Sequence, residues 1–195
     1  MKKFALLFVG LIALSLILFT GCSASLTTTS PATATVTSTA SADTILTVIN
    51  GGKTVTYSLS DLKALTSVSG WGGMSTMHGN VASIQYKGVA MSVLLKAVGG
   101  MTDKTSLVVT AKDNYTRTLT YDQVVNGNFS VSDLSGNSIT PSTKPVLCVV
   151  YEQSGAALDS DSGPIMLGIM TAQNQLTGGD NWVKEVCKIE VVSAP

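Results

Sequence analysis

The alternation of apolar and polar positions predicts a series of short β-strands between residues 44 and 195. Residues 44–49 alternate around Leu46 and Val48, and the alternation resumes after the turn Asn50-Gly51-Gly52, which is typical of a β-hairpin. Further strands are predicted at residues 83–86, 106–111, 116–119, 145–152, 165–170 and 183–192.

Three short helices are expected between these strands. Ser60 is a candidate N-cap for a helix that begins at Asp61. Residues 92–97 predict a second helix, which Gly99-Gly100 would end. Residues 121–125 could form one further helical turn. Because the strands and helices do not follow a regular strand-helix-strand rhythm, the pattern predicts an α+β domain.

Residues 68–81 interrupt the alternation. This segment is rich in Gly, Ser and Met, and it contains Trp71 and the single histidine of the chain, His78. Because it has no consistent period, we predict a long loop, and such loops are usually functional or mobile. Catalysis of the Ser-His-Asp or Cys-His kind could be built only around His78, which is otherwise an ordinary loop residue.

The start of the chain has the features of an export signal. Lys2 and Lys3 precede an uncharged apolar run, and Gly21-Cys22 follows it. This order predicts a lipoprotein signal peptide over residues 1–21 and lipidation of Cys22. An ordinary signal with a chance cysteine and an uncleaved helix are the alternatives. We expect an exported protein that is lipid-anchored on the outer face of the cytoplasmic membrane.

Residues 22–43 consist almost wholly of Ser, Thr, Ala and Pro. They could bury too little apolar surface to offset their ordering entropy, so we predict a flexible tether. Residues 44–195 have the length and apolar content of one folded domain. Without Lys2 and Lys3, 10 basic side chains stand against 12 acidic ones, a net charge of −2. Since no basic stripe is present, nucleic acid is excluded as an expected partner.

Cys148 and Cys187 both lie in apolar runs typical of strands. Export would permit a disulfide between them, but a disulfide needs close and correctly aimed Cβ atoms. We favour buried free thiols and keep the disulfide as the alternative. No spacing of His and Cys is typical of a zinc site. Asp159 to Gly163 imitates the start of a calcium loop, but Met170 falls where the bidentate acid would stand, so a turn is predicted.

The order of several short motifs resembles the molybdopterin-binding domain of sulfite oxidase-like oxidoreductases, from about Tyr57 to Val192. The motifs are Ser58-Leu59-Ser60-Asp61-Leu62, Tyr86-Lys87-Gly88-Val89, Ala111-Lys112-Asp113-Asn114-Tyr115, Tyr151-Glu152, Gly163-Pro164-Ile165 and Trp182-Val183-Lys184. The resemblance implies an α+β fold with several β-layers. It also implies a molybdenum pterin that is held by a cysteine thiolate and by basic residues around its phosphate, and that supplies oxygen-atom transfer chemistry.

The sequence departs from that family at two positions. Ser67 stands where catalytic relatives have the cysteine that binds the metal, and an alcohol is a far poorer ligand than a thiolate. Met166 stands where relatives have an arginine, and the single arginine of the chain is Arg117. We therefore expect no bound metal and treat molybdopterin as a less favoured alternative.

A domain related to pterin-binding proteins would keep a cleft, which the apolar side chains of the 68–81 segment could line. Tyr86 and Trp182 could also line it, although we favour the core for both. The candidate pocket residues are Ser67, Trp71, Met74, Met77, His78, Arg117 and Met166.

Three functions remain open, and no catalytic residue is identified. The first is a membrane-tethered module that binds a small molecule or a partner and has lost the metal. The second is a molybdopterin-dependent oxidoreductase with unusual ligation. The third is a structural partner of a neighbouring membrane oxidoreductase.

Overall fold

The computed structural model describes residues 43–195. The predicted signal peptide, the lipidation of Cys22 and all but the last residue of the predicted tether lie outside the described residues. Within residues 43–195, no helix is long and apolar enough to cross a membrane.

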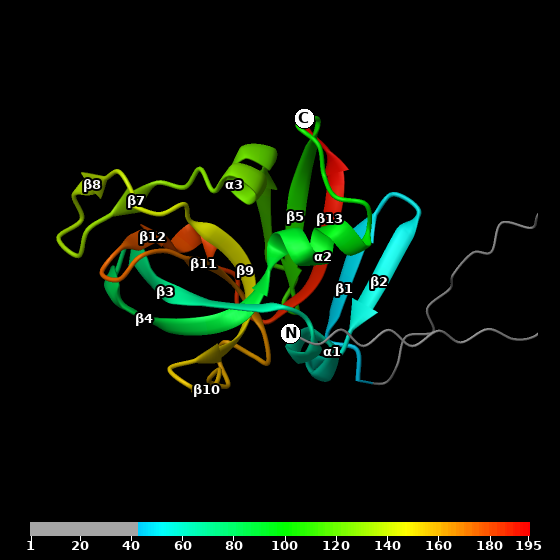
Figure 1. Ribbon diagram of the computed structural model, residues 1–195, viewed down its shortest axis with the longest axis horizontal. Coiled ribbons are helices and arrows are strands. Elements are labelled where there is room, and N and C mark those ends of the chain that lie inside the picture. The colour runs from blue at the N-terminus through cyan, green and yellow to red at the C-terminus, as the bar shows by residue number, and fades with distance from the viewer. Residues whose placement is uncertain (1–42) are drawn as a thin grey trace, which may run out of the picture. The chain divides into compact units, whose positions relative to one another are not determined.

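One sheet has five strands in the order β2-β1-β13-β5-β6 (Figure 1). In chain order they are β1 (Leu46–Asn50), β2 (Lys53–Tyr57), β5 (Thr105–Ala111), β6 (Thr116–Thr120) and β13 (Val186–Ser193). β1 pairs with β13 in parallel, with Val48 opposite Ile189, and the other neighbours are antiparallel. Leu46, Val48 and Ile189 are fully buried. The alternation in these strands therefore places one face of the sheet against the core.

The second sheet has eight strands, in the order β10-β9-β4-β3-β12-β7-β8 with β11 paired to β9. They are β3 (Ser67–Thr76), β4 (Gly79–Ala90), β7 (Val131–Ser132), β8 (Ser138–Ile139), β9 (Val146–Gln153), β10 (Ala156–Ala157), β11 (Met166–Met170) and β12 (Leu176–Gly178). Every residue of β11 is buried, as are residues 147–151 of β9. Burial on both faces explains why these two strands are continuous apolar runs without alternation.

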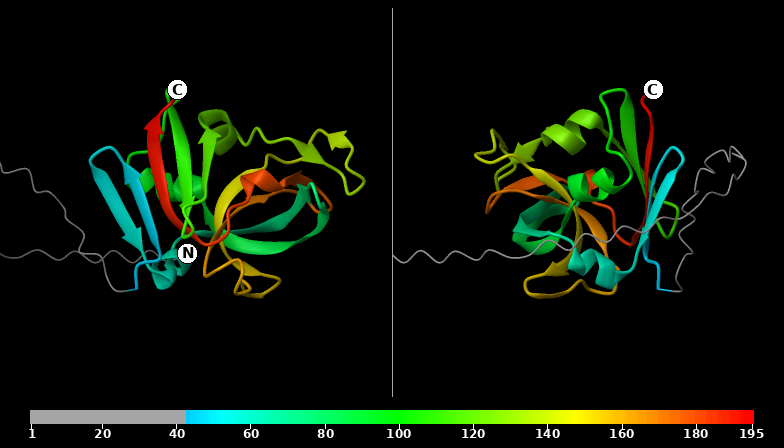
Figure 2. Two further views of the ribbon diagram at one scale, coloured as in Figure 1. Left: turned by 180° about the vertical axis from the view of Figure 1, so that it is seen from behind. Right: turned by 45° about the vertical axis from the view of Figure 1, so that its right-hand side comes forward.

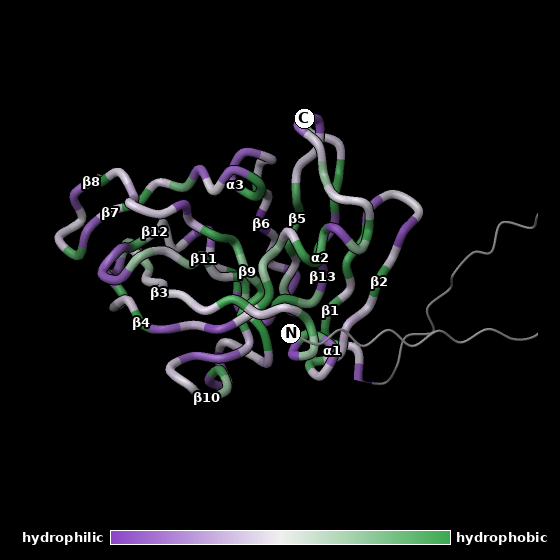
Figure 3. Tube along the Cα trace, viewed as in Figure 1, coloured by the Kyte–Doolittle hydropathy of each residue, from purple (hydrophilic) through white to green (hydrophobic). Residues whose placement is uncertain are grey.

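The helices are α1 (Leu59–Ala64), α2 (Met91–Ala97) and α3 (Tyr121–Asn126), and a 3-10 turn, η1, covers Gly179–Asn181. α2 packs on β4 and β9, and α3 packs on β5, β6 and β9. Figure 2 shows α2 in the angle between the two sheets, and the hydropathy colouring shows apolar segments gathered in this region (Figure 3). The described chain is mostly β-sheet with a few short helices, which is compatible with an α+β fold.

The first helix begins two residues earlier than the sequence predicts. Its N-cap is Ser58 rather than Ser60, and the helix starts at Leu59. The Ser58 hydroxyl accepts a hydrogen bond from the Asp61 backbone N–H at 3.1 Å, and the Ser58 N–H donates to the Asp61 carboxylate at 2.8 Å. This reciprocal pair is a capping box, and it needs the acid three residues after the cap. Because Asp61 is three residues after Ser58, Ser58 rather than Ser60 is the N-cap.

The prediction of a long loop at residues 68–81 is wrong, because the segment forms most of β3 and the start of β4. The two strands pair in antiparallel fashion, with Gly70 opposite Tyr86 and Gly72 opposite Ile84. The strand lacks alternating apolar residues because glycines stand where side chains from other segments occupy the space beside the backbone. A Cβ at Gly72 would lie 2.7 Å from the Trp182 ring, and one at Gly73 would lie 2.6 Å from Leu176.

Candidate functional site

A pocket of about 490 Å³ opens beside β3 and β4 and extends to the segments around β10 and β13. This volume is in the range of small-molecule sites. We call it the Trp182 pocket. It is lined by Met74, Val81, Ile84, Tyr86, Gln153, Asp159, Ser162, Met166, Gly179, Trp182, Val183 and Lys184.

Trp182 forms a wall of the pocket and is held from several directions. It follows η1, and its backbone N–H donates to the Gly179 carbonyl at 3.1 Å. Its indole Nε1 donates to the Thr177 hydroxyl at 2.9 Å, and this contact is buried. The ring lies over Gly72 and Gly168, where added Cβ atoms would come within 2.7 and 2.9 Å of it. The indole is therefore a preorganised surface rather than a mobile side chain.

Tyr86 supplies a second aromatic ring. Its centroid lies 5.4 Å from that of Trp182 with an interplanar angle of 51°, a tilted arrangement that aromatic pairs favour. Both residues are buried, at 5% and 8% exposure, and both line the pocket. Burial raises the pKa of the Tyr86 phenol above its ordinary value, and the negative charge of Asp159 adds to the shift. Tyr86 is therefore a neutral hydrogen-bonding group at physiological pH.

The polar end of the pocket is built by Gln153, Asp159, Ser162 and Lys184. The turn predicted at residues 159–163 is present, and the Ser162 N–H donates to the Asp159 carboxylate at 2.7 Å. Hydrogen bonds from Ser162 hold the pKa of Asp159 below its ordinary value, with smaller contributions from Lys184 and Gln153. Asp159 is thus a carboxylate, and both Asp159 and Lys184 are exposed at the rim of the pocket.

The structure brings two of the sequence-predicted residues, Met74 and Met166, into the Trp182 pocket. Met77 and His78 instead line a shallower hollow of about 410 Å³ at the β3–β4 turn, together with Asp180. Gly179 lies at both hollows. Met77 is 96% exposed, so its side chain contributes little apolar enclosure.

Ser67 and Trp71 line neither of these two pockets. Ser67 is exposed at the start of β3, opposite Val89 of β4. Trp71 is half-buried further along β3, where its carbonyl accepts the Thr171 backbone N–H at 2.6 Å. Ser67 was chosen from a family motif and Trp71 from the predicted loop, and neither signal indicates toward which side of a strand a side chain points.

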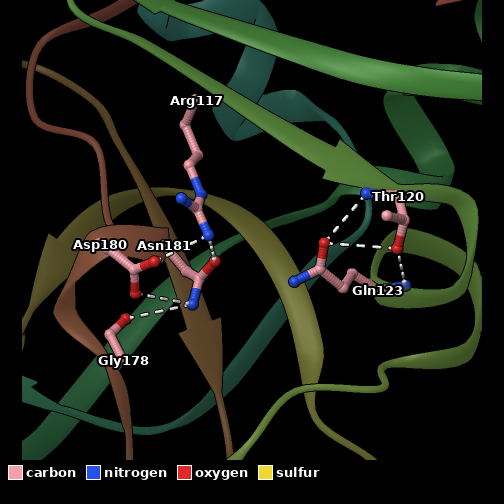
Figure 4. Close-up of polar contacts among 6 residues, drawn as sticks. All are labelled: Arg117, Thr120, Gln123, Gly178, Asp180 and Asn181. Atoms are coloured by element: carbon pink, nitrogen blue, oxygen red, sulfur yellow. Dashed lines mark hydrogen bonds and ion pairs between the residues drawn. The ribbon is translucent and has the colours of Figure 1, made fainter. Parts of the chain in front are cut away.

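Arg117 is engaged by other protein groups (Figure 4). Its Nη2 lies 2.8 Å from the Asp180 carboxylate and 2.8 Å from the Asn181 amide oxygen. Arg117 comes from β6 of the five-stranded sheet, whereas Asp180 and Asn181 belong to η1, which precedes Trp182. The guanidinium therefore holds the turn that carries the aromatic wall, and Asp180 neutralises its charge.

The two cysteines within residues 43–195, Cys148 and Cys187, are free thiols. Cys148 is buried in β9, and burial raises its pKa to about 12. Cys187 is half-buried in β13 of the other sheet. Among residues 43–195, no group of three or more His, Cys, Asp or Glu side chains could hold a metal ion.

The sequence patterns do not identify Gln153, Asp159, Ser162 or Lys184 as pocket residues. Residues 159–163 were predicted only as a turn, and Lys184 appeared only as part of a family motif. These residues come from segments that are distant in sequence and lack a common spacing. The single usable indication was that the motifs around Gly163 and Trp182 both belong to the pattern of the resembled family.

No protein-family model matches the sequence, and no curated protein matches it. Among solved structures, the chain is similar to the crystal structure of the sulfane dehydrogenase SoxCD from Paracoccus pantotrophus, with a TM-score of 0.54 and 16% sequence identity. The match covers 76% of this chain and 38% of that chain, so this chain spans less than half of that relative. At this identity the likeness shows the fold alone, and it supports a distant sulfite oxidase-like fold.

Proposed function

We propose that this chain is an exported lipoprotein, anchored through Cys22 to the outer face of the cytoplasmic membrane, whose folded part binds a small molecule without molybdenum. The single observation that carries the binding function is the Trp182 pocket, about 490 Å³ in volume with two fixed aromatic rings and a polar rim. A concave, mostly apolar site with a few polar groups at one end is the usual form of a small-molecule site.

Two observations support the loss of the metal. Ser67, at the position of the family's cysteine, is exposed and lies outside the pocket. Neither Cys148, which is buried in β9, nor Cys187, which lies in β13, lines the pocket, so neither described thiol is placed to bind a metal there. The described residues therefore do not fit the metal that the resembled family holds.

The pterin phosphate also lacks its usual partner. Phosphate is held best by the two-pronged hydrogen bonds of a guanidinium group. Arg117 already binds Asp180 and Asn181, and Met166 lines the pocket where relatives have an arginine. A dianion in the pocket would meet Lys184 and also the carboxylate of Asp159, so its binding would be opposed as well as favoured.

Elemental analysis of protein purified from membranes of a host that makes molybdenum cofactor tests the metal-free proposal. We expect no stoichiometric molybdenum and no pterin fluorescence after denaturation. Stoichiometric molybdenum would overturn the proposal and favour the second candidate, an oxidoreductase of unusual ligation, which the fold likeness to a sulfane dehydrogenase supports. The anchor is tested by fatty-acid labelling, which should be lost in Cys22→Ser.

A further inference from the structure

The Trp182 pocket separates apolar and charged groups. Met74, Ile84 and Met166 lie with the two aromatic rings, whereas Gln153, Asp159, Ser162 and Lys184 form the polar end. Among the described residues that line the pocket, Asp159 and Lys184 carry the formal charges, and these are of opposite sign. A ligand that fills the pocket must therefore place its apolar part against the rings and a polar part beside a carboxylate and an ammonium group.

Lys184 is exposed at the rim and is available to pair with a ligand. Its ammonium forms no ion pair or hydrogen bond with any residue in the range 43–195, although it lies close enough to Asp159 to influence it electrostatically. The Asp159 carboxylate is orientated by Ser162 and Gln153. A carboxylate can accept about four hydrogen bonds, so Asp159 keeps acceptor capacity for a ligand.

We propose that the Trp182 pocket binds a free α-amino acid with an apolar side chain. The ligand ammonium group pairs with Asp159, the ligand carboxylate pairs with Lys184, and the side chain lies against Trp182 and Tyr86. This assignment rests on the proposed function of the pocket as a small-molecule site.

A ligand with one charge fits this rim less well than a zwitterion does. An amine would pair with Asp159 but would face the ammonium of Lys184, and a carboxylate would pair with Lys184 but would face Asp159. A neutral molecule would gain the apolar contacts and would leave both rim charges solvated. Only a ligand with adjacent positive and negative groups balances both charges, which is how electrostatic complementarity gives specificity.

Four probes with the same phenyl group separate these cases: L-phenylalanine, phenethylamine, 3-phenylpropanoate and 2-phenylethanol. Binding at millimolar concentrations is measured by calorimetry and by Trp182 fluorescence in a Trp71→Phe background. We expect L-phenylalanine to bind most tightly. Because both rim groups are exposed, each pairing should contribute about twofold to fivefold in affinity.

Two rim variants should give opposite patterns. Asp159→Asn should weaken L-phenylalanine and phenethylamine by about twofold to fivefold and should not weaken 3-phenylpropanoate. Lys184→Gln should weaken L-phenylalanine and 3-phenylpropanoate and should not weaken phenethylamine. Asp161→Asn is the matched control, because Asp161 belongs to the same turn and does not line the pocket. It should leave all four affinities unchanged.

The outcomes separate the two levels of the proposal. If all four probes bind equally, or if either rim variant affects the amine and the acid alike, the amino-acid assignment is wrong while the pocket remains a binding site. If no probe binds to protein that unfolds cooperatively, both the assignment and the proposed binding function are wrong.

Discussion

The contact between Gly72 and the Trp182 ring can be tested by adding one methyl group. In Gly72→Ala the new Cβ would lie 2.7 Å from Cη2 of Trp182, 3.0 Å from the Ile169 carbonyl oxygen and 3.1 Å from Cδ2 of Tyr86. Carbon atoms in contact normally lie about 3.5–4.0 Å apart. Because the indole is also held by Thr177 and lies against Gly168, it cannot move away from the new methyl group without loss of these contacts.

Overpacking of this kind costs about 1 to 3 kcal/mol. For a domain of this size, each kcal/mol lowers the melting temperature by about 2 to 4 °C. We therefore expect Gly72→Ala to reduce the free energy of unfolding by about 1 to 3 kcal/mol. Displacement of the indole should also weaken ligand binding in the Trp182 pocket.

Urea denaturation measures the loss of stability, and fluorescence reports the displacement. The chain has two tryptophans, so a Trp71→Phe background leaves Trp182 as the reporter. Gly52→Ala is the matched control, since a Cβ there meets nothing within 4 Å. If Gly72→Ala unfolds at the same urea concentration as the control and its Trp182 emission is unchanged, the close contact at Gly72 does not fix the position of the Trp182 ring.

Three further changes test other parts of the structure. Thr177→Val removes the acceptor of the buried Trp182 Nε1 and should cost about 1 to 3 kcal/mol in urea denaturation, whereas Thr177→Ser should retain most of the stability. The pKa of Cys148 is about 12, so iodoacetamide at pH 8 should label this thiol only after unfolding; mass spectrometry showing labelling of the native protein would contradict its burial. Thr120→Ala removes the side chain that accepts the Gln123 N–H at the start of α3 and should lower the free energy of unfolding by about 1 kcal/mol; an unchanged value would show that the cap contributes nothing.

Local sequence patterns predicted most of the secondary structure. The hairpin of β1 and β2, the strands β5, β6, β9 and β11 and the helix α2 all lie close to their predicted ranges. Each depends on signals within a few residues, such as alternation, a turn sequence or a glycine stop. α1 was displaced by two residues because two serines compete for the cap, and only the geometry of Asp61 decides between them.

The hairpin of β3 and β4 could not be predicted in this way. Its glycines are required by contacts with Met170, Trp182 and Leu176, which are about 100 residues away in sequence. Where side chains from distant residues pack directly on the backbone of a strand, that strand needs small residues, and the alternating pattern is lost. The sequence therefore looks like a loop where the tertiary structure has two long paired strands.

The sequence predicted some residues of the candidate site and misplaced others. Met166 was chosen from a motif and lines the pocket, while Ser67, also chosen from a motif, lies outside it. Tyr86 and Trp182 were assigned to the core, and they are buried as well as being pocket walls. Burial on most sides and exposure to a cavity on one side produce the same apolar sequence pattern, so the pattern could not separate the two roles.

Sequence alone predicted the apolar strands and a resemblance to a sulfite oxidase-like domain, of which the structural comparison supports a distant likeness of fold. These features are carried by residue identity and by short spacing. Only the tertiary structure decided that Arg117 pairs with Asp180, that Trp182 rests on two glycines, and that Asp159 and Lys184 share one rim. Those contacts join segments that are distant in the sequence, and only the folding of the chain brings them together.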